Sequence, residues 1–198
     1  MSGQSQKIYL IRHGATEWST SGKHTGLTDL PLIEEGRRNA ERLAPHLREI
    51  TFARVITSPL KRARETCELA GLCENAEEDA NLVEWDYGDY EGVTSAEIHR
   101  SHPGWMVFTD GCPNGEMPTD VGKRVDRVIT KVRAIGGHVA LFAHGHVLRV
   151  LAARWLGLPP EAGRHFTLDT STLNVLGYYH DSPAIVLWNA PLPSQMEG

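Results

Sequence analysis

The sequence predicts a three-layer α/β fold, in which a doubly wound, mostly parallel sheet carries helices on both of its faces. Five short apolar runs that suit β-strands cover residues 7–11, 53–57, 138–143, 173–179 and 184–189. Segments with helical spacing of their apolar residues alternate with the first three runs, which is typical of a doubly wound sheet. The length of 198 residues suits one domain that spans the whole chain, residues 1–198, around a single core.

Helical periodicity marks four segments, namely residues 33–50, 60–72 and 118–135 and the stretch that follows His146. Pro45 predicts a kink in the first of them. In residues 118–135 the apolar side chains share one face, so its cations, Arg124 among them, are expected on a solvated face. The last two strands, joined across residues 180–183, are expected to form a hairpin that adds an antiparallel edge to the sheet.

The composition restricts the partners of the protein. A net charge of -5 argues against a general nucleic-acid-binding surface, so an anionic ligand would require a local positive pocket. No apolar run is long enough to cross a bilayer, and residues 1–7 are short and polar, so we expect a cytoplasmic protein that does not contact membranes. Residues 1–6 and 191–198 are expected to be flexible.

A cation, an imidazole and a glycine follow directly on the first apolar run, as Arg12-His13-Gly14. The predicted strand would place Arg12 and His13 at its carboxyl end, where open α/β sheets bind their ligands. Gly14 permits a sharp turn, and Ser19 supplies a hydroxyl group in the following turn. The pattern predicts a histidine beside an arginine in an anion-binding pocket, although a histidine at a strand end is also a common structural residue.

A second histidine-glycine pair, His144-Gly145, follows the strand predicted over residues 138–143. If this strand and the first one are neighbours in a parallel sheet, His13 and His144 face each other across its carboxyl edge. His146 stands at the start of the predicted helix, and we interpret it as a structural residue.

The segment 58–66 follows another predicted strand and is rich in cations. Ser58 suits the N-cap of a helix and Pro59 its first turn, so Arg62 would lie one turn into a helix that points at the same edge. A solvated basic helix face is the alternative. The stretch 84–92 is acidic, aromatic and aperiodic, and beside such a pocket one of its carboxylates, Glu84, could protonate a leaving group.

These stretches together resemble the histidine phosphatase superfamily, in the branch that contains the cofactor-dependent phosphoglycerate mutases and their phosphatase relatives. The resemblance covers nearly the whole chain. Within the branch, the 84–92 loop and residues 110–116 are most similar to broad acid phosphatases and sugar-bisphosphate phosphatases. The motifs that carry the resemblance are, in chain order, Arg12-His13-Gly14, residues 25–32, residues 58–66, residues 84–92 and His144-Gly145-His146.

The resemblance implies a phosphoglycerate-mutase-like fold and a reaction without metal or cofactor. It implies that His13 is transiently phosphorylated and that Glu84 is the acid and then the base. The phosphate pocket would be formed by Arg12, Arg62 and His144, with the backbone of Gly145 completing it and a protonated His144 adding positive charge. Further substrate contacts are implied for Ser19, Thr25 and Gly26, although Ser19 replaces an asparagine that is common in the mutases.

Two departures from the mutases favour hydrolysis of phosphate esters. Trp85 stands where the mutases carry an arginine after the catalytic glutamate, and the chain lacks their longer basic insertion. The expected substrate is therefore a small phosphorylated metabolite, with a phosphoglycerate mutase as the alternative. A homodimer is also compatible with the family.

Two other classes of function are alternatives to a histidine phosphatase. A metal-dependent hydrolase could use His13, His144 and His146 as ligands, but no carboxylate ligand stands beside either histidine pair. A silent phospho-ligand binding module would be expected to have lost one of the catalytic groups. Three cysteines, an odd number without paired metal-ligand spacing, are expected to be reduced thiols, namely Cys67, Cys73 and Cys112.

Overall fold

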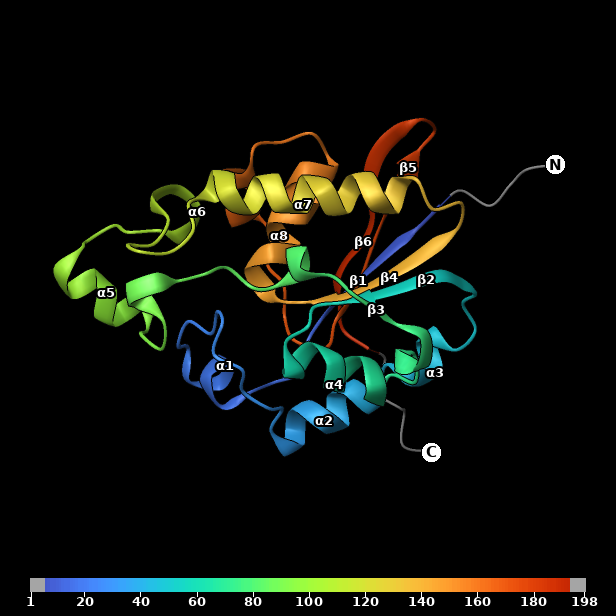
Figure 1. Cartoon of the computed structure of the whole chain (residues 1–198), viewed down its shortest axis with the longest axis horizontal. Helices are drawn as coiled ribbons and strands as arrows, with labels where there is room; N and C mark the ends of the chain where they lie inside the picture. Colours follow the sequence, from blue (N-terminus) through green and yellow to red (C-terminus); the bar gives the residue numbers. More distant parts are fainter. Residues whose placement is uncertain (1–5, 193–198) are drawn as a thin grey trace.

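The computed structural model describes residues 6–192, and within them the chain forms a six-stranded sheet with the strand order β3-β2-β4-β1-β5-β6 (Figure 1). The strands are β1 (Ile8–Arg12), β2 (Phe52–Thr57), β3 (Glu77–Glu78), β4 (His138–Ala143), β5 (Leu173–Tyr179) and β6 (Ser182–Ala190). The four strands from β3 to β1 run parallel, whereas β5 and β6 are antiparallel and form the hairpin expected from the sequence. The predicted α/β class and mostly parallel sheet are confirmed.

Helices cover both faces of this sheet. The α-helices are α1 (Glu17–Ser21), α2 (Glu34–Glu41), α3 (Ala44–Leu47), α4 (Lys61–Leu69), α5 (Ser95–Ser101), α6 (Val107–Asp110), α7 (Pro118–Arg133) and α8 (Gly145–Trp155). Short 3-10 turns are η1 (Cys73–Asn75), η2 (Ala80–Leu82), η3 (Gly88–Tyr90) and η4 (Pro160–His165). In Figure 1, α7 and α8 lie on one side of the sheet and α2, α3 and α4 on the other, which gives the three layers.

Alternation along the strands divides the core into two halves. Ile8 and Leu10 pack with the apolar face of α7 and with α8, whereas Tyr9 and Ile11 pack against α3 and α4 on the opposite face. Because side chains in a strand alternate between the two faces, a continuous apolar run such as β1 must be covered on both sides. At about 25 cal/mol per Å² of buried apolar surface, this coverage is the main stabilising contribution.

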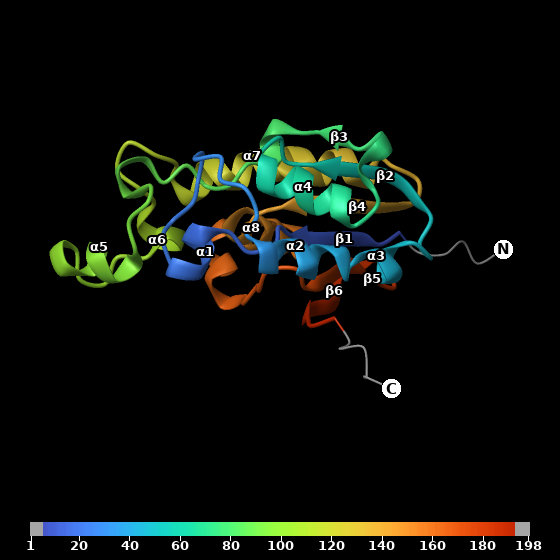
Figure 2. The ribbon, with the colours of Figure 1, turned by 90° about the horizontal axis from the view of Figure 1, so that it is seen from below.

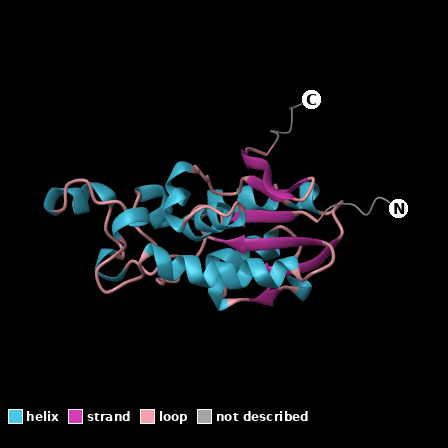
Figure 3. Ribbon diagram, turned by 90° about the horizontal axis from the view of Figure 1, so that it is seen from above, coloured by secondary structure: helices cyan, strands magenta, loops and turns pink. Residues whose placement is uncertain are grey.

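The carboxyl ends of the parallel strands meet a segment of short helices and loops that extends beyond the sheet (Figures 2 and 3). This segment includes α5 and α6 and lies within residues 91–116, which are rich in glycine, proline, histidine and aromatic residues and have no clear helical or strand period in the sequence. Phe108 is buried there, whereas Met106 is exposed. No helix in residues 6–192 is long and apolar enough to span a membrane.

Three local predictions were wrong. The helix predicted over 33–50 is interrupted, because α2 ends at Glu41 and Pro45 lies in the first turn of α3 instead of kinking one continuous helix. Ser58 is not an N-cap: α4 begins at Lys61, whose backbone N–H donates to Asp29 from the 25–32 loop at 2.7 Å. Arg124 is buried instead of solvated, since it binds carbonyls of the loop before Glu84.

The three cysteines are free thiols, as expected. Burial, together with nearby carboxylates, raises the pKa of Cys112 to about 12, which keeps it protonated and unreactive at neutral pH. The predicted flexible ends fall almost entirely outside the described residues.

Candidate active site

His13 follows β1 and is held in one tautomer. Its backbone N–H donates to Ala143 of the neighbouring strand at 3.0 Å, and its Nδ1 lies 2.7 Å from the carbonyl oxygen of Gly14. A carbonyl can only accept, so Nδ1 carries the proton and Nε2 carries a lone pair. Burial, then the charges of Arg62 and Arg12, hold the pKa of His13 well below its usual value. The side chain is therefore a neutral imidazole, which is the form required of a nucleophile.

Gly14 serves close packing and not an unusual backbone angle. A Cβ atom there would lie 2.4 Å from the carbonyl oxygen of Gly36, and the Gly14 N–H donates to the Thr66 hydroxyl at 3.0 Å. The loop after β1 is thus packed directly onto α2 and α4, which fixes the position of His13.

His144 precedes α8, and its ring lies 5.1 Å from the ring of His13, measured between centroids. Parallel pairing of β1 with β4 places the two residues at the same edge, as expected. The Arg62 Nε–H donates to Nδ1 of His144 at 3.1 Å, so the remaining proton is on Nε2, which donates to the Ser58 hydroxyl at 2.7 Å. Burial and the neighbouring cations hold the pKa of His144 well below its usual value. The expectation of a protonated His144 is wrong in this structure.

Arg62 is fully buried and most of its donors are already bound. Besides the bond to His144, its guanidinium donates to the carbonyl oxygens of Thr28 at 2.9 Å, Thr25 at 3.1 Å and Gly26 at 2.7 Å. These four bonds leave one of the five N–H groups of an arginine without a partner. Arg62 can therefore offer a single donor and a fixed positive charge to a phosphate group. A bidentate interaction would require the 25–28 loop to move.

Arg12 has more free donors than Arg62. One Nη donates to the carbonyl oxygen of Leu168, whereas the buried Nε has no hydrogen-bond partner. A buried donor without a partner is costly, so an acceptor that fills this position would be favoured. Gly145 makes room for the guanidinium, because a Cβ atom there would come within 3.3 Å of it.

Glu84 is buried, and its carboxylate receives three backbone N–H groups. Oε1 accepts from Trp85 and from Val147, each at 2.9 Å, and Oε2 accepts from His146 at 3.0 Å. Two of these donors belong to the first turn of α8, where unpaired N–H groups and the helix dipole attract anions. Oε2 keeps a free lone pair, which is the position where a transferable proton would sit.

Arg124 positions the loop that carries Glu84. It forms an ion pair with Glu116 at 2.8 Å and donates to the carbonyl oxygens of Asn81 at 2.8 Å, Val83 at 2.7 Å and Glu84 at 3.1 Å. One planar group thus binds three carbonyl groups of residues 81–84 and connects them to Glu116.

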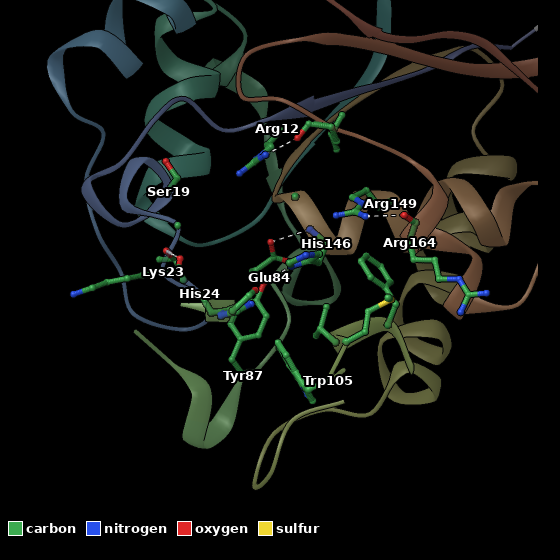
Figure 4. A pocket seen from close by; sticks show the side chains of 18 of the residues that line it. Arg12, Ser19, Lys23, His24, Glu84, Tyr87, Trp105, His146, Arg149 and Arg164 are labelled. Carbon is green, nitrogen blue, oxygen red and sulfur yellow. Dashed lines mark hydrogen bonds between the residues drawn. The ribbon is translucent and has the colours of Figure 1, made fainter. Parts of the chain in front are cut away.

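A cavity of about 730 Å³ opens beside these groups (Figure 4). Arg12, His13, Glu84 and Gly145 line it, whereas Arg62 and His144 stand behind the lining. Sequence reasoning missed much of the wall, which is rich in aromatic and cationic side chains. The missed lining residues include Lys23, His24, Tyr87, Arg149 and Arg164, whereas Trp105 and Phe108 belong to the segment 91–116, which the sequence suggests as a cap over the pocket. Only Arg149 had a usable signal, since it lies four residues after Gly145 on the predicted helix.

Groups of three or more metal-ligating side chains with suitable placement are absent from residues 6–192.

A family model described as the histidine phosphatase superfamily (branch 1) matches residues 8–191. The chain belongs to this superfamily. It is 39% identical to an acid phosphatase of Mycobacterium tuberculosis over 91% of the chain and 90% of that protein. It is 32% identical to a sedoheptulose 1,7-bisphosphatase of Saccharomyces cerevisiae over 94% of each chain. A solved structure of a Mycobacterium tuberculosis open reading frame matches with a TM-score of 0.91 at 36% identity, over 96% of this chain and 100% of that one.

The chain is therefore a histidine phosphatase, an enzyme that hydrolyses phosphate monoesters. The phosphoglycerate mutase alternative has less support, because relatives named as probable mutases match at only 29–30% identity. The predicted phosphatase class is confirmed.

Of the three further substrate contacts predicted for this histidine phosphatase, two residues line the cavity and one does not. Ser19 and Thr25 line the cavity, but the Ser19 hydroxyl already exchanges hydrogen bonds with the backbone of Thr16 in a capping box. Gly26 is outside the lining, and its N–H donates to the Glu91 carboxylate at 2.9 Å. Gly26 therefore acts on Arg62 through its carbonyl group, and its predicted substrate contact would require a rearrangement.

Proposed function

We propose that this histidine phosphatase cleaves phosphate monoesters of small metabolites through a phosphohistidine formed on Nε2 of His13. The observation that carries the proposal is the hydrogen bond from Nδ1 to the Gly14 carbonyl oxygen, which directs the lone pair to Nε2. The low pKa of His13 supports it, because a protonated ring has no lone pair to attack phosphorus.

In the first step, Nε2 of His13 forms a bond to phosphorus while the bond from phosphorus to the ester oxygen breaks. Glu84 transfers its proton to the departing oxygen, because an alkoxide is a poor leaving group. In the second step a water attacks phosphorus and gives a proton to Glu84, while the bond from phosphorus to Nε2 of His13 breaks, its electron pair returns to Nε2, and inorganic phosphate is released. His13 returns to its neutral form and Glu84 to its protonated form.

The charge of the transferring phosphoryl group would be balanced by groups that are already in place. Arg12 contributes its unpartnered Nε and further guanidinium donors, and Arg62 contributes one donor and a fixed charge. His144 would contribute as a neutral donor, by turning its Nε2 proton from Ser58 to a phosphoryl oxygen. The backbone N–H of Gly145 completes the set.

These groups supply the positive charge that a metal ion supplies in other phosphatases, so we propose a metal-independent reaction without a cofactor. We also propose a cytoplasmic location and a substrate range of the kind found in broad acid phosphatases and sugar-bisphosphate phosphatases. The possible homodimer stays a prediction, which sedimentation of the purified protein would test.

Rapid-quench labelling with a phosphorus-32 substrate tests the function. The wild type should yield an acid-labile, base-stable phosphoenzyme within one turnover, and His13→Ala should abolish it. His99→Ala is the matched control, since His99 lies on α5 at the rim of the same cavity and should keep the label. Label that persists in His13→Ala would assign the nucleophile to another residue.

A further inference from the structure

The cavity carries more positive charge than one phosphoryl group requires. Its lining contains four arginine and lysine residues, Arg12, Lys23, Arg149 and Arg164, but only one acidic residue, Glu84. The whole chain, in contrast, has a net charge of -5. Arg12 accounts for the reacting phosphate, and the other three cations are unused by the reaction described above.

Arg149 is the cation that faces the cavity. In Figure 4 its guanidinium points toward the space between Arg12 and His146, whereas the side chains of Lys23 and Arg164 extend outward. It comes from α8, one turn after Gly145, so the helix that begins at the catalytic edge also delivers this charge.

The contacts of Arg149 hold it in place without neutralising it. Nε donates to the carbonyl oxygen of Gly163 at 3.1 Å, Nη2 donates to that of Arg164 at 3.3 Å, and the group lies 4.4 Å from the ring centroid of Phe108. Among residues 6–192, no carboxylate forms an ion pair with it. The Nη1 group has no hydrogen-bond partner in that range. A half-buried cation in this state gains strongly from an anion that replaces its lost water.

We infer that Arg149 binds a second anionic group, a phosphate or a carboxylate, carried by the leaving-group part of the substrate. This inference rests on the proposed function, because it places the reacting phosphate at His13 and the remainder of the substrate along the aromatic wall. Tyr87 and Trp105 line that wall and offer flat surfaces to a carbon chain. Arg164 and Lys23 add long-range attraction at the mouth.

Steady-state kinetics with matched substrate pairs test the inference. Fructose 1,6-bisphosphate is compared with fructose 6-phosphate, and 3-phosphoglycerate with glycerol 3-phosphate, so one pair adds a phosphate and the other a carboxylate. The wild type should prefer the member with two anions in at least one pair, and that pair identifies the group. Arg149→Gln should reduce this preference in kcat/KM by about 10- to 100-fold, the range for a hydrogen bond to a charged group.

Two further variants separate binding from a structural role. Arg149→Lys loses the bonds to the carbonyl oxygens of Gly163 and Arg164 but keeps the positive charge. Because the charge remains, this variant should retain much of the preference for the substrate with two anions. Arg164→Gln, which removes an outward-pointing cation, should change the ratio by less than about threefold, as expected for a solvated charge. An equal loss for both members of each pair in Arg149→Gln, or a wild type without any preference, would overturn the inference.

The proposed function is tested separately by p-nitrophenyl phosphate, which carries a single anion. If this substrate gives no phosphoenzyme that depends on His13, the proposed function fails. If p-nitrophenyl phosphate gives a phosphoenzyme that depends on His13 in the wild type and in Arg149→Gln alike, while the substrate pairs show no preference, only the second anion site fails.

Discussion

Replacement of Glu84 by glutamine should separate substrates by the quality of their leaving group. The amide cannot deliver a proton as a carboxylic acid does, and general acid catalysis contributes typically about 10²- to 10⁴-fold. We expect Glu84→Gln to slow phosphoenzyme formation from glucose 6-phosphate by a factor in this range. Phosphoenzyme formation from p-nitrophenyl phosphate should slow by less than about 10-fold, because the nitrophenolate departs without protonation.

The structure also predicts that Glu84→Gln lowers the free energy of unfolding, an effect that is independent of the substrate. If the amide oxygen takes the place of Oε1, it keeps the bonds from Trp85 and Val147. The amide NH₂ then faces the His146 N–H, where Oε2 now accepts at 3.0 Å. One buried donor loses its acceptor, at a cost of about 1–3 kcal/mol. Thermal unfolding measures this cost independently of the kinetics.

The assay is a single-turnover rapid-quench measurement, which isolates the first step from later hydrolysis, where Glu84 also acts. Asp86→Asn is the matched control, because Asp86 lies in the same loop and its carboxylate accepts from the Gly88 N–H at 3.0 Å. The control should affect both substrates alike. Equal losses for both substrates in Glu84→Gln would refute the acid role and direct attention to Asp86, Glu17 or His144.

Three other predictions concern the whole enzyme. His13, His144 and His146 have a pKa well below 6.5 in the folded state, so the unfolded state binds more protons below that pH. Unfolding free energy should therefore fall as pH decreases from 6.5 to 5.5, by up to about 1.4 kcal/mol per pH unit for each group; a flat urea-unfolding profile would contradict this. With 3-phosphoglycerate and its bisphosphate primer, phosphate release should far exceed formation of the 2-isomer, and the opposite ratio would indicate a mutase. Turnover should survive dialysis against a chelator and be inhibited by vanadate; loss that zinc or magnesium restores would indicate a metal site.

The sequence was sufficient to place the two histidines, for a simple physical reason. Each follows an apolar run too long and too continuous for a half-exposed strand, and parallel strands bring their carboxyl ends to one edge. Pairing of β1 with β4 then fixes the 5.1 Å separation of the rings of His13 and His144. The phosphatase class depended on the family resemblance, since periodicity alone does not distinguish a catalytic histidine from a structural one.

The sequence could not show how the cations are used, because their partners are distant along the chain. Arg62 donates to carbonyls about 35 positions earlier and Arg124 to carbonyls about 40 positions earlier, and backbone acceptors leave no trace in residue identity. The same reason explains the error at α4, where the N–H of its first residue, Lys61, donates to Asp29 and not to Ser58. Local patterns identify capping residues only when the cap is local.

The arrangement of charges around His13 also bears on the pH at which this phosphatase works best. Burial and the two arginines depress the pKa of His13, so the nucleophile stays unprotonated as the solution becomes mildly acidic. The nucleophile is thus in its active, neutral form on the acidic side of neutrality as well as at neutral pH.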